Sequence, residues 1–180
     1  TLNLQISRLD VEVPPSYQLG VEGQKKQGRL LDDKIASDDR VEVARGDREL
    51  ARIYVEMLQP IAEGLVVAFR TRRLANAARK TWKLDPTEGA IVSFPEKAKG
   101  AFAEEVKGPT QFRRQLRELN CQCLIVVGPY LDQLRLVNDL GKDVSDSMGI
   151  ILLNARIHGD RTTIKIPPKL KRELQETFAP

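Results

Sequence analysis

A run of arginines follows one of the most apolar segments of the chain. Arg70, Arg72 and Arg73 come directly after Leu65–Phe69, in which every side chain is apolar. Guanidinium groups bind carboxylates and phosphates through paired hydrogen bonds, so this run predicts contact with an anion or with an acidic partner surface. The alternative is that these arginines only solvate the outer face of a helix. The cluster Arg113, Arg114 and Arg117 has the same two interpretations.

Three further side chains are predicted to share the first site because they follow other apolar segments. Tyr130 comes after Cys123–Val127, and Asn154 and Arg156 come after Gly149–Leu153. In open α/β sheets, ligands collect beyond the carboxyl ends of the strands. The predicted partner or anion contacts are therefore Arg70, Arg72, Arg73, Tyr130, Asn154 and Arg156.

No catalytic constellation accompanies these residues. The single histidine, His158, stands in a polar His-Gly-Asp turn, which is typical of a solvated side chain rather than of a triad. Neither GxGxxG nor GxxxxGK[ST] occurs, so a nucleotide site of the usual kinds is not expected. Paired carboxylates lie in polar surroundings, typical of solvated surface: Glu104 and Glu105, Asp32 and Asp33, Asp38 and Asp39. The sequence predicts no catalytic residue, no cofactor and no metal.

The two cysteines, Cys121 and Cys123, are separated by one residue at the start of a predicted strand. Strand alternation would place both side chains on the same face of the sheet. A zinc site needs about four ligands, and His158 adds little to two thiols. The pattern favours buried, reduced thiols.

Length and composition indicate one globular domain covering residues 1–180. The chain has 180 residues, of which 41% are hydrophobic and 30% charged, a balance that excludes disordered and fibrous classes. The net charge of +4 comes from interspersed acidic and basic residues, which argues against nucleic acid as the partner. The apolar runs fall far short of the ~20 residues that span a bilayer, so no integral membrane segment is predicted.

The elements that must position these residues alternate between short apolar strands and amphipathic helices. The expected strands are Leu4–Val13, Leu65–Phe69, Ala90–Phe94, Cys123–Val127 and Gly149–Leu153. Helices are expected after the caps Asp47 and Thr71, over Gln111–Leu119 and Tyr130–Leu140, and around Leu170–Phe178. This order predicts βαβ units and hence an α/β three-layer sandwich with a mostly parallel sheet of about five strands, Rossmann-like or flavodoxin-like.

One segment departs from this alternation. From Ser16 to Gly46 the chain is rich in Gly, Gln, Lys and Asp and has few large apolar residues. Such a composition predicts a polar, mobile arm at residues 16–46.

Several segments together have a familiar pattern: Arg8–Pro15, Gly46–Ala51, Val66–Phe69 leading into Ala75, Ala78, Arg79 and Trp82, Leu124–Pro129, and Gly149–Asn154. With them the chain resembles a domain of unknown function from chloroplasts and cyanobacteria. That domain occurs in the low-photosystem-II-accumulation proteins and is fused behind some plastid adenylate kinases. The resemblance implies a chloroplast location, in the stroma or at the stromal face of the thylakoid, after removal of a transit peptide not present in this chain.

The resemblance also implies a function: a non-enzymatic, protein-binding factor in assembly, stabilisation or accessory function of a photosynthetic thylakoid complex. It supplies no catalytic residue, and because the P-loop is missing, adenylate kinase activity does not carry over. Two alternatives stay open, a small-anion or nucleotide-binding α/β domain and an RNA-associated plastid protein. A ligand site predicts a deep pocket lined by Arg70, Tyr130 and Asn154, a protein-binding role predicts a shallow surface, and an RNA role predicts strongly salt-dependent binding.

Overall fold

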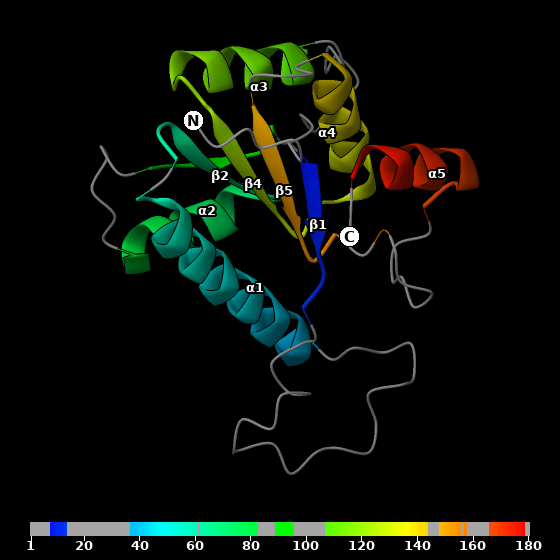
Figure 1. Ribbon diagram of the computed structural model, residues 1–180. Coiled ribbons are helices and arrows are strands. Elements are labelled where there is room, and N and C mark those ends of the chain that lie inside the picture. Colours follow the sequence, from blue (N-terminus) through cyan, green and yellow to red (C-terminus); the bar gives the residue numbers. More distant parts are fainter. Residues whose placement is uncertain are drawn as a thin grey trace.

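Five short strands and five helices alternate along the chain (Figure 1). The computed structural model describes residues 8–13, 37–60, 62–82, 89–95, 107–143, 148–155, 157 and 166–178. The strands are β1 (Arg8–Val11), β2 (Leu65–Phe69), β3 (Ala90–Ser93), β4 (Cys123–Val127) and β5 (Gly149–Leu153). The helices are α1 (Ser37–Leu58), α2 (Arg72–Trp82), α3 (Lys107–Glu118), α4 (Leu131–Asp143) and α5 (Pro168–Thr177).

The strands form one sheet in the order β1-β5-β4-β2-β3, and every neighbouring pair is parallel. Both β2 and β4 are apolar runs covered on both faces, as expected for central parallel strands. The predicted strands Leu65–Phe69, Cys123–Val127 and Gly149–Leu153 are confirmed, and they are neighbours in the sheet. The α/β sandwich with a parallel sheet is therefore the fold.

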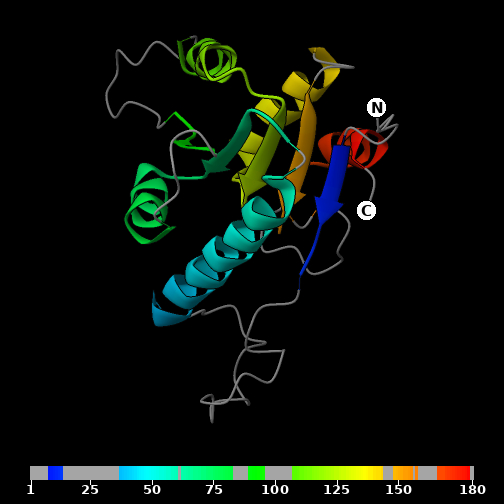
Figure 2. The same ribbon diagram turned by 60° about the vertical axis from the view of Figure 1, so that its left-hand side comes forward.

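Right-handed crossovers decide which face each helix covers. Figures 1 and 2 show α1 and α2 on one side of the sheet and α3, α4 and α5 on the other. Each side has its own core: Ala51, Val55 and Trp82 pack on one face, and Phe112, Leu134 and others pack on the opposite face.

The strand order corresponds to a known plan with one strand displaced. Without β1, the order β3-β2-β4-β5 is that of the first four strands of a flavodoxin-like sheet, 2-1-3-4-5. The N-terminal strand β1 occupies the edge where the fifth strand of that plan would lie. The order in which strands are added reverses between β2 and β4, and sheets of this kind bind ligands at that switch point.

The turns before β2 and β4 each contain a residue with positive φ. Gly64 has φ 62°, and a Cβ there would lie 2.1 Å from the backbone oxygen of Asn120. Asn120 itself has φ 48° and ends α3. The close approach of the two turns places β2 and β4 in register from their first residues, Leu65 and Cys123.

The start of α1 is where the sequence prediction was wrong. The helix begins at Ser37, ten residues before the predicted cap Asp47, so residues 37–46 are helical and not part of an arm. The rest of the predicted arm, residues 16–36, lies outside the described residues. Thr71, by contrast, is confirmed as a cap, because the Leu74 amide donates to its Oγ1 at 3.3 Å.

A polar cluster joins α4 to α5 on the second face. The Lys142 ammonium donates to Glu173 at 2.7 Å, and the Asn138 amide donates to the same carboxylate at 3.1 Å. These bonds lower the pKa of Glu173 below its ordinary value, with the Lys142 hydrogen bond as the main cause. In β1, Arg8 donates to the backbone oxygen of Gly141 in α4, so the edge strand is also tied to this layer.

Candidate functional site

At the switch point between β2 and β4, the predicted residues Arg70 and Tyr130 come together. The Arg70 guanidinium lies over the Tyr130 ring, 5.3 Å from its centroid, and the tyrosine is 44% exposed. A stacked arginine on an exposed aromatic ring is a pair of side chains typical of protein interfaces. The two residues therefore form a flat, exposed feature at this edge.

Gln133, which the sequence analysis missed, fills the space beneath this pair. Its side chain is buried, donates to the Arg70 carbonyl at 2.8 Å and accepts from the Tyr130 amide at 2.9 Å. Both backbone groups are thereby satisfied within the protein. A glutamine three residues into a helix is the signal that sequence reasoning could have used.

Asn154 has a structural role rather than a ligand-facing one. Its side chain accepts from the Val13 amide at 2.8 Å and donates to the Asp47 carboxylate at 2.6 Å. It thereby connects the ends of β1 and β5 to α1. The Asp47 carboxylate also lies close to Gly128, where an added Cβ would be 3.3 Å from Oδ2. The side chain predicted to line a pocket is instead used to join three elements.

The remaining predicted contacts are Arg72, Arg73 and Arg156. Arg72 and Arg73 are exposed in the first turn of α2, and Arg156 lies outside the described residues. The cleft that the structure describes is lined by other residues and lies on another part of the surface. A deep pocket lined by Arg70, Tyr130 and Asn154 stays a prediction.

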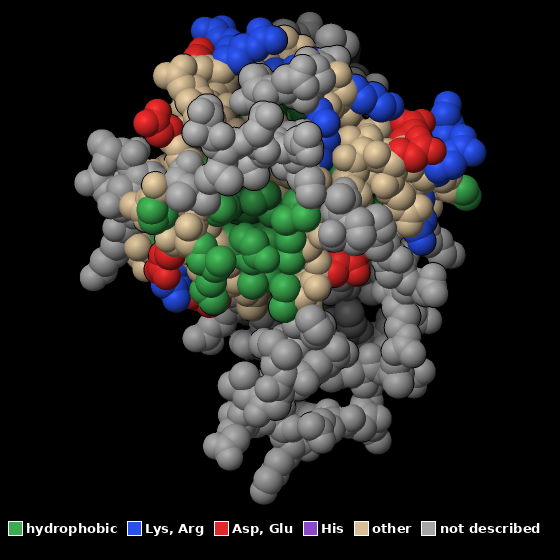
Figure 3. All heavy atoms as spheres, in the orientation of Figure 1, with side chains coloured by type: hydrophobic (Ala, Val, Ile, Leu, Met, Phe, Trp, Pro, Cys, Tyr) green, Lys and Arg blue, Asp and Glu red, His purple; other side chains and the backbone are tan. Residues whose placement is uncertain are grey.

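A second feature is an apolar surface beside α1. The Asp47 carboxylate accepts a hydrogen bond from Asn154, so this flank of α1 is the one beside β5. Leu50, Tyr54 and Met57 follow Asp47 at helical spacing on the same flank. Met57 is 65% exposed. Figure 3 shows hydrophobic side chains gathered over the strands beside α1. This flank therefore lies beside the sheet, and Met57 on it is exposed to solvent.

The floor of this surface is the β1–β5 half of the sheet. On the α1 side, Val11 and Ile151 are only partly buried, whereas Ile125 and Val67 beneath α1 are fully buried. The main sheet contacts of α1 are with β2 and β4, and those of α2 are with β2 and β3. We call this surface the open face, defined by Val11, Leu50, Tyr54, Met57, Cys123 and Ile151.

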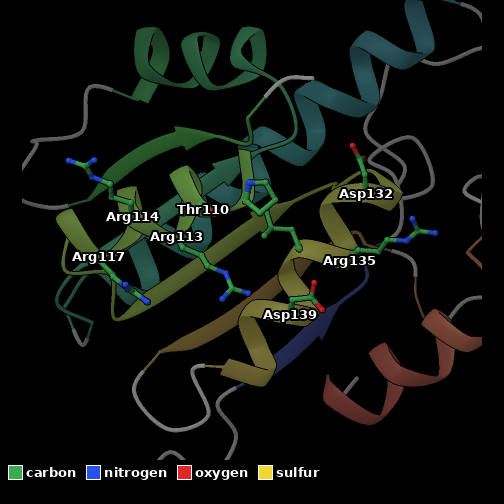
Figure 4. Close-up of a pocket in the computed structure, with 9 residues that line it drawn as sticks. Thr110, Arg113, Arg114, Arg117, Asp132, Arg135 and Asp139 are labelled. Atoms are coloured by element: carbon green, nitrogen blue, oxygen red, sulfur yellow. The ribbon is translucent and has the colours of Figure 1, made fainter. Parts of the chain in front are cut away.

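The third feature is a cleft between α3 and α4, with a volume of about 660 Å³. Two helical stripes line it: Pro109, Thr110, Arg113, Arg114 and Arg117 from α3, and Asp132, Arg135, Leu136 and Asp139 from α4. In Figure 4 the Arg113 side chain points toward α4, while Arg114 and Arg135 point away from the cleft. Arg114 is bound to Glu118 at 2.8 Å. The lining holds more arginines than aspartates, so the cleft is positively charged.

The cysteines do not share a sheet face as predicted. Cys121 packs against the core beneath α3, whereas Cys123 packs against the core beneath α1. The reason is that Cys121 lies in the turn before β4, where the two-residue alternation of a strand has not begun. Both are free thiols and partly buried, and burial raises the pKa of Cys121 to about 12, so it stays protonated at neutral pH.

Asp10, in the edge strand β1, is a buried ionisable side chain. It is 4% exposed, and burial, together with the charge of Glu12, raises the pKa of its carboxyl to about 7. Within the described ranges no group of three or more His, Cys, Asp or Glu side chains could hold a metal ion. The described helices include none that is both long enough and apolar enough to cross a bilayer.

Comparison of the chain with family models, with curated proteins and with solved structures finds no match. The resemblance to the plastid and cyanobacterial domain therefore stays a prediction.

Proposed function

We propose that this chain is a non-enzymatic, protein-binding factor of plastids that acts in assembly, stabilisation or accessory function of a photosynthetic thylakoid complex. The observation that carries the protein-binding part is the open face. It is apolar, it lies beside an exposed helix flank, and the sheet beneath it is only partly buried. The chloroplast location and the photosynthetic partner are supported by the sequence resemblance.

The dimensions of the open face favour a helix as its occupant. Strands β5 and β1 together are about 10 Å wide, since neighbouring strands lie ~4.8 Å apart. Packed helices are separated by ~8 to 10 Å, so one further helix fits beside α1. On the opposite face, Leu174 of α5 packs in one core with Ile150 of β5, which shows how a helix covers this half of the sheet.

The occupant that fits is an amphipathic helix of the partner protein. Its apolar side would contact Ile151 and Val11 below and Tyr54 and Met57 beside it, in a helix-in-groove arrangement. The Arg70–Tyr130 pair lies at the carboxyl edge of the neighbouring strands, β2 and β4. It supplies a second, polar contact of the kind that sets specificity.

The test is affinity purification of the full chain from chloroplast extract, with Met57→Asp as the variant. Because Met57 is largely exposed, the substitution leaves the fold intact, which circular dichroism checks. Leu119→Asp is the matched control, since Leu119 is an exposed apolar residue at the end of α3. We expect subunits of a photosynthetic complex with wild type and with the control, and their loss with Met57→Asp. Equal recovery with Met57→Asp would contradict the role of the open face, and absence of photosynthetic subunits would contradict the assigned partner.

A further inference from the structure

The cleft between α3 and α4 is lined by charged side chains that take no part in the proposed protein docking at the open face. Its volume of about 660 Å³ lies within the ~300 to 1,000 Å³ range of small-molecule sites. It lies between α3 and α4 on the second face, and Arg113, Arg117 and Asp139 are among its charged lining residues.

Arg113 and Arg117 are four residues apart, so they project from the same side of α3 on successive turns. Arg113 is partly buried, which restricts its guanidinium to few orientations. The Arg117 side chain is exposed, and among the described residues its guanidinium makes no hydrogen bond or ion pair. Two guanidiniums at this spacing can hold one tetrahedral dianion through charge-assisted hydrogen bonds.

Asp139 determines what else the ligand must carry. It lines the cleft from α4, whereas the two arginines line it from α3, so its carboxylate repels a bare anion but accepts a hydrogen bond from a hydroxyl group. Leu136 and Pro109 add an apolar wall to the same space. A ligand that fits has a phosphate at one end and a hydroxyl-bearing body beside it.

We propose that this cleft binds a phosphomonoester of a hydroxyl-bearing small molecule, with the phosphate on Arg113 and Arg117 and a hydroxyl group on Asp139. A sugar phosphate is the simplest such ligand, and a nucleoside monophosphate has the same recognition chemistry. The proposal rests on the cleft alone and is independent of protein docking at the open face.

Calorimetry of the full chain with ribose 5-phosphate tests this directly. Inorganic phosphate, ribose and 5′-AMP serve as the comparison probes. We expect ribose 5-phosphate to bind more tightly than inorganic phosphate, and ribose not to bind. Binding of 5′-AMP as tight as that of ribose 5-phosphate identifies a nucleotide as the natural class, and weaker binding identifies a sugar phosphate. Failure of both phosphomonoesters to bind, or equal binding of ribose 5-phosphate and inorganic phosphate, overturns the proposal.

Two variants separate specific binding from general charge. Arg117→Glu should weaken ribose 5-phosphate binding about tenfold or more, because it removes a charge-assisted hydrogen bond. Arg172→Glu in α5 makes the same charge change at an exposed site away from the cleft and should leave affinity unchanged. Asp139→Asn should weaken ribose 5-phosphate but strengthen inorganic phosphate. Equal losses of ribose 5-phosphate affinity from Arg117→Glu and Arg172→Glu would contradict the assignment. So would a parallel change in the affinity for both ligands with Asp139→Asn.

Discussion

Asn154 shows how a residue at a strand end can serve the fold when its position suggests ligand binding. It has φ 54°, a conformation that costs most side chains ~1 to 2 kcal/mol, and its side chain bonds both to the Val13 amide and to Asp47. Asparagine tolerates this backbone better than most residues. An asparagine at the end of this strand predicted a ligand contact. Its hydrogen bonds, which join β1, β5 and α1, explain the same residue at the same position.

Asn154→Ala should lower the free energy of unfolding by about 2 to 4 kcal/mol, since it adds backbone strain to the loss of two hydrogen bonds. Asn154→Gly should lower it less, because glycine accepts positive φ without strain. Asn120→Ala is the control for strain alone, since Asn120 has φ 48° and an exposed side chain. Urea unfolding measures all three, and equal losses for Asn154→Ala and Asn154→Gly would contradict the strain contribution.

Asp10 makes stability depend on pH. Burial, with a smaller effect from Glu12, raises the pKa of its carboxyl from 3.8 to about 7 in the folded protein. The folded state therefore holds the proton more tightly than the unfolded chain does, and the stabilisation present below pH about 4 is lost as pH rises through about 7. Asp10→Asn should remove this dependence.

We expect Asp10→Asn to gain stability relative to wild type as pH rises from 4 to 8, as measured by urea unfolding at each pH. Glu12→Gln, at an exposed position, should shift the wild-type decline to lower pH by removing the second cause of the raised pKa. Parallel stability curves for wild type and Asp10→Asn would show that Asp10 titrates alike in both states.

At the scale of elements, β4 has the strictest requirement for apolar side chains. It pairs with β2 and β5, and Val126 is fully buried within it. An aspartate at this position would leave a charge in the core at a cost of several kcal/mol, comparable with a whole stability of ~5 to 15 kcal/mol.

Val126→Asp should therefore abolish soluble expression, while Leu119→Asp, at an exposed apolar position, should express normally. Yield of soluble protein and circular dichroism measure the outcome. A folded Val126→Asp variant would contradict the central place of β4.

Strands β2, β4 and β5 could be predicted because each is a short apolar run, and such runs have few other places in a domain. The start of α1 could not, because residues 37–46 are mostly polar and contain Gly46, which costs a helix only ~1 kcal/mol and does not end it. The presence of Arg113 and Asp139 in one cleft depends on α3 and α4 lying side by side. That arrangement follows from the crossovers β3 to β4 and β4 to β5 having the same direction, which no local pattern contains.

At the scale of the whole molecule, the sheet has unequal edges. Strand β1 pairs with β5 on one side only and is partly buried apart from Asp10, whereas β4 is central. Amide hydrogen exchange should therefore be slowest in Leu124–Val127 and faster in Leu9–Val11. Slower exchange in β1 than in β4 would mean that the edge strand is held by contacts beyond those with β5 and α4.

The displaced position of β1 also affects how the chain is made. Strand β1 precedes β2, β3 and β4 along the chain but pairs with β5, which follows them, so this part of the sheet cannot form while the intervening residues are still being added. At ~5 to 20 residues per second, that interval lasts roughly ten to thirty seconds. During this time β2, β3 and β4 can already associate while β1 waits with its backbone groups unpaired. Docking of β1 is thus expected to be a late step in biogenesis, and a nascent chain stalled before Gly149 should lack it.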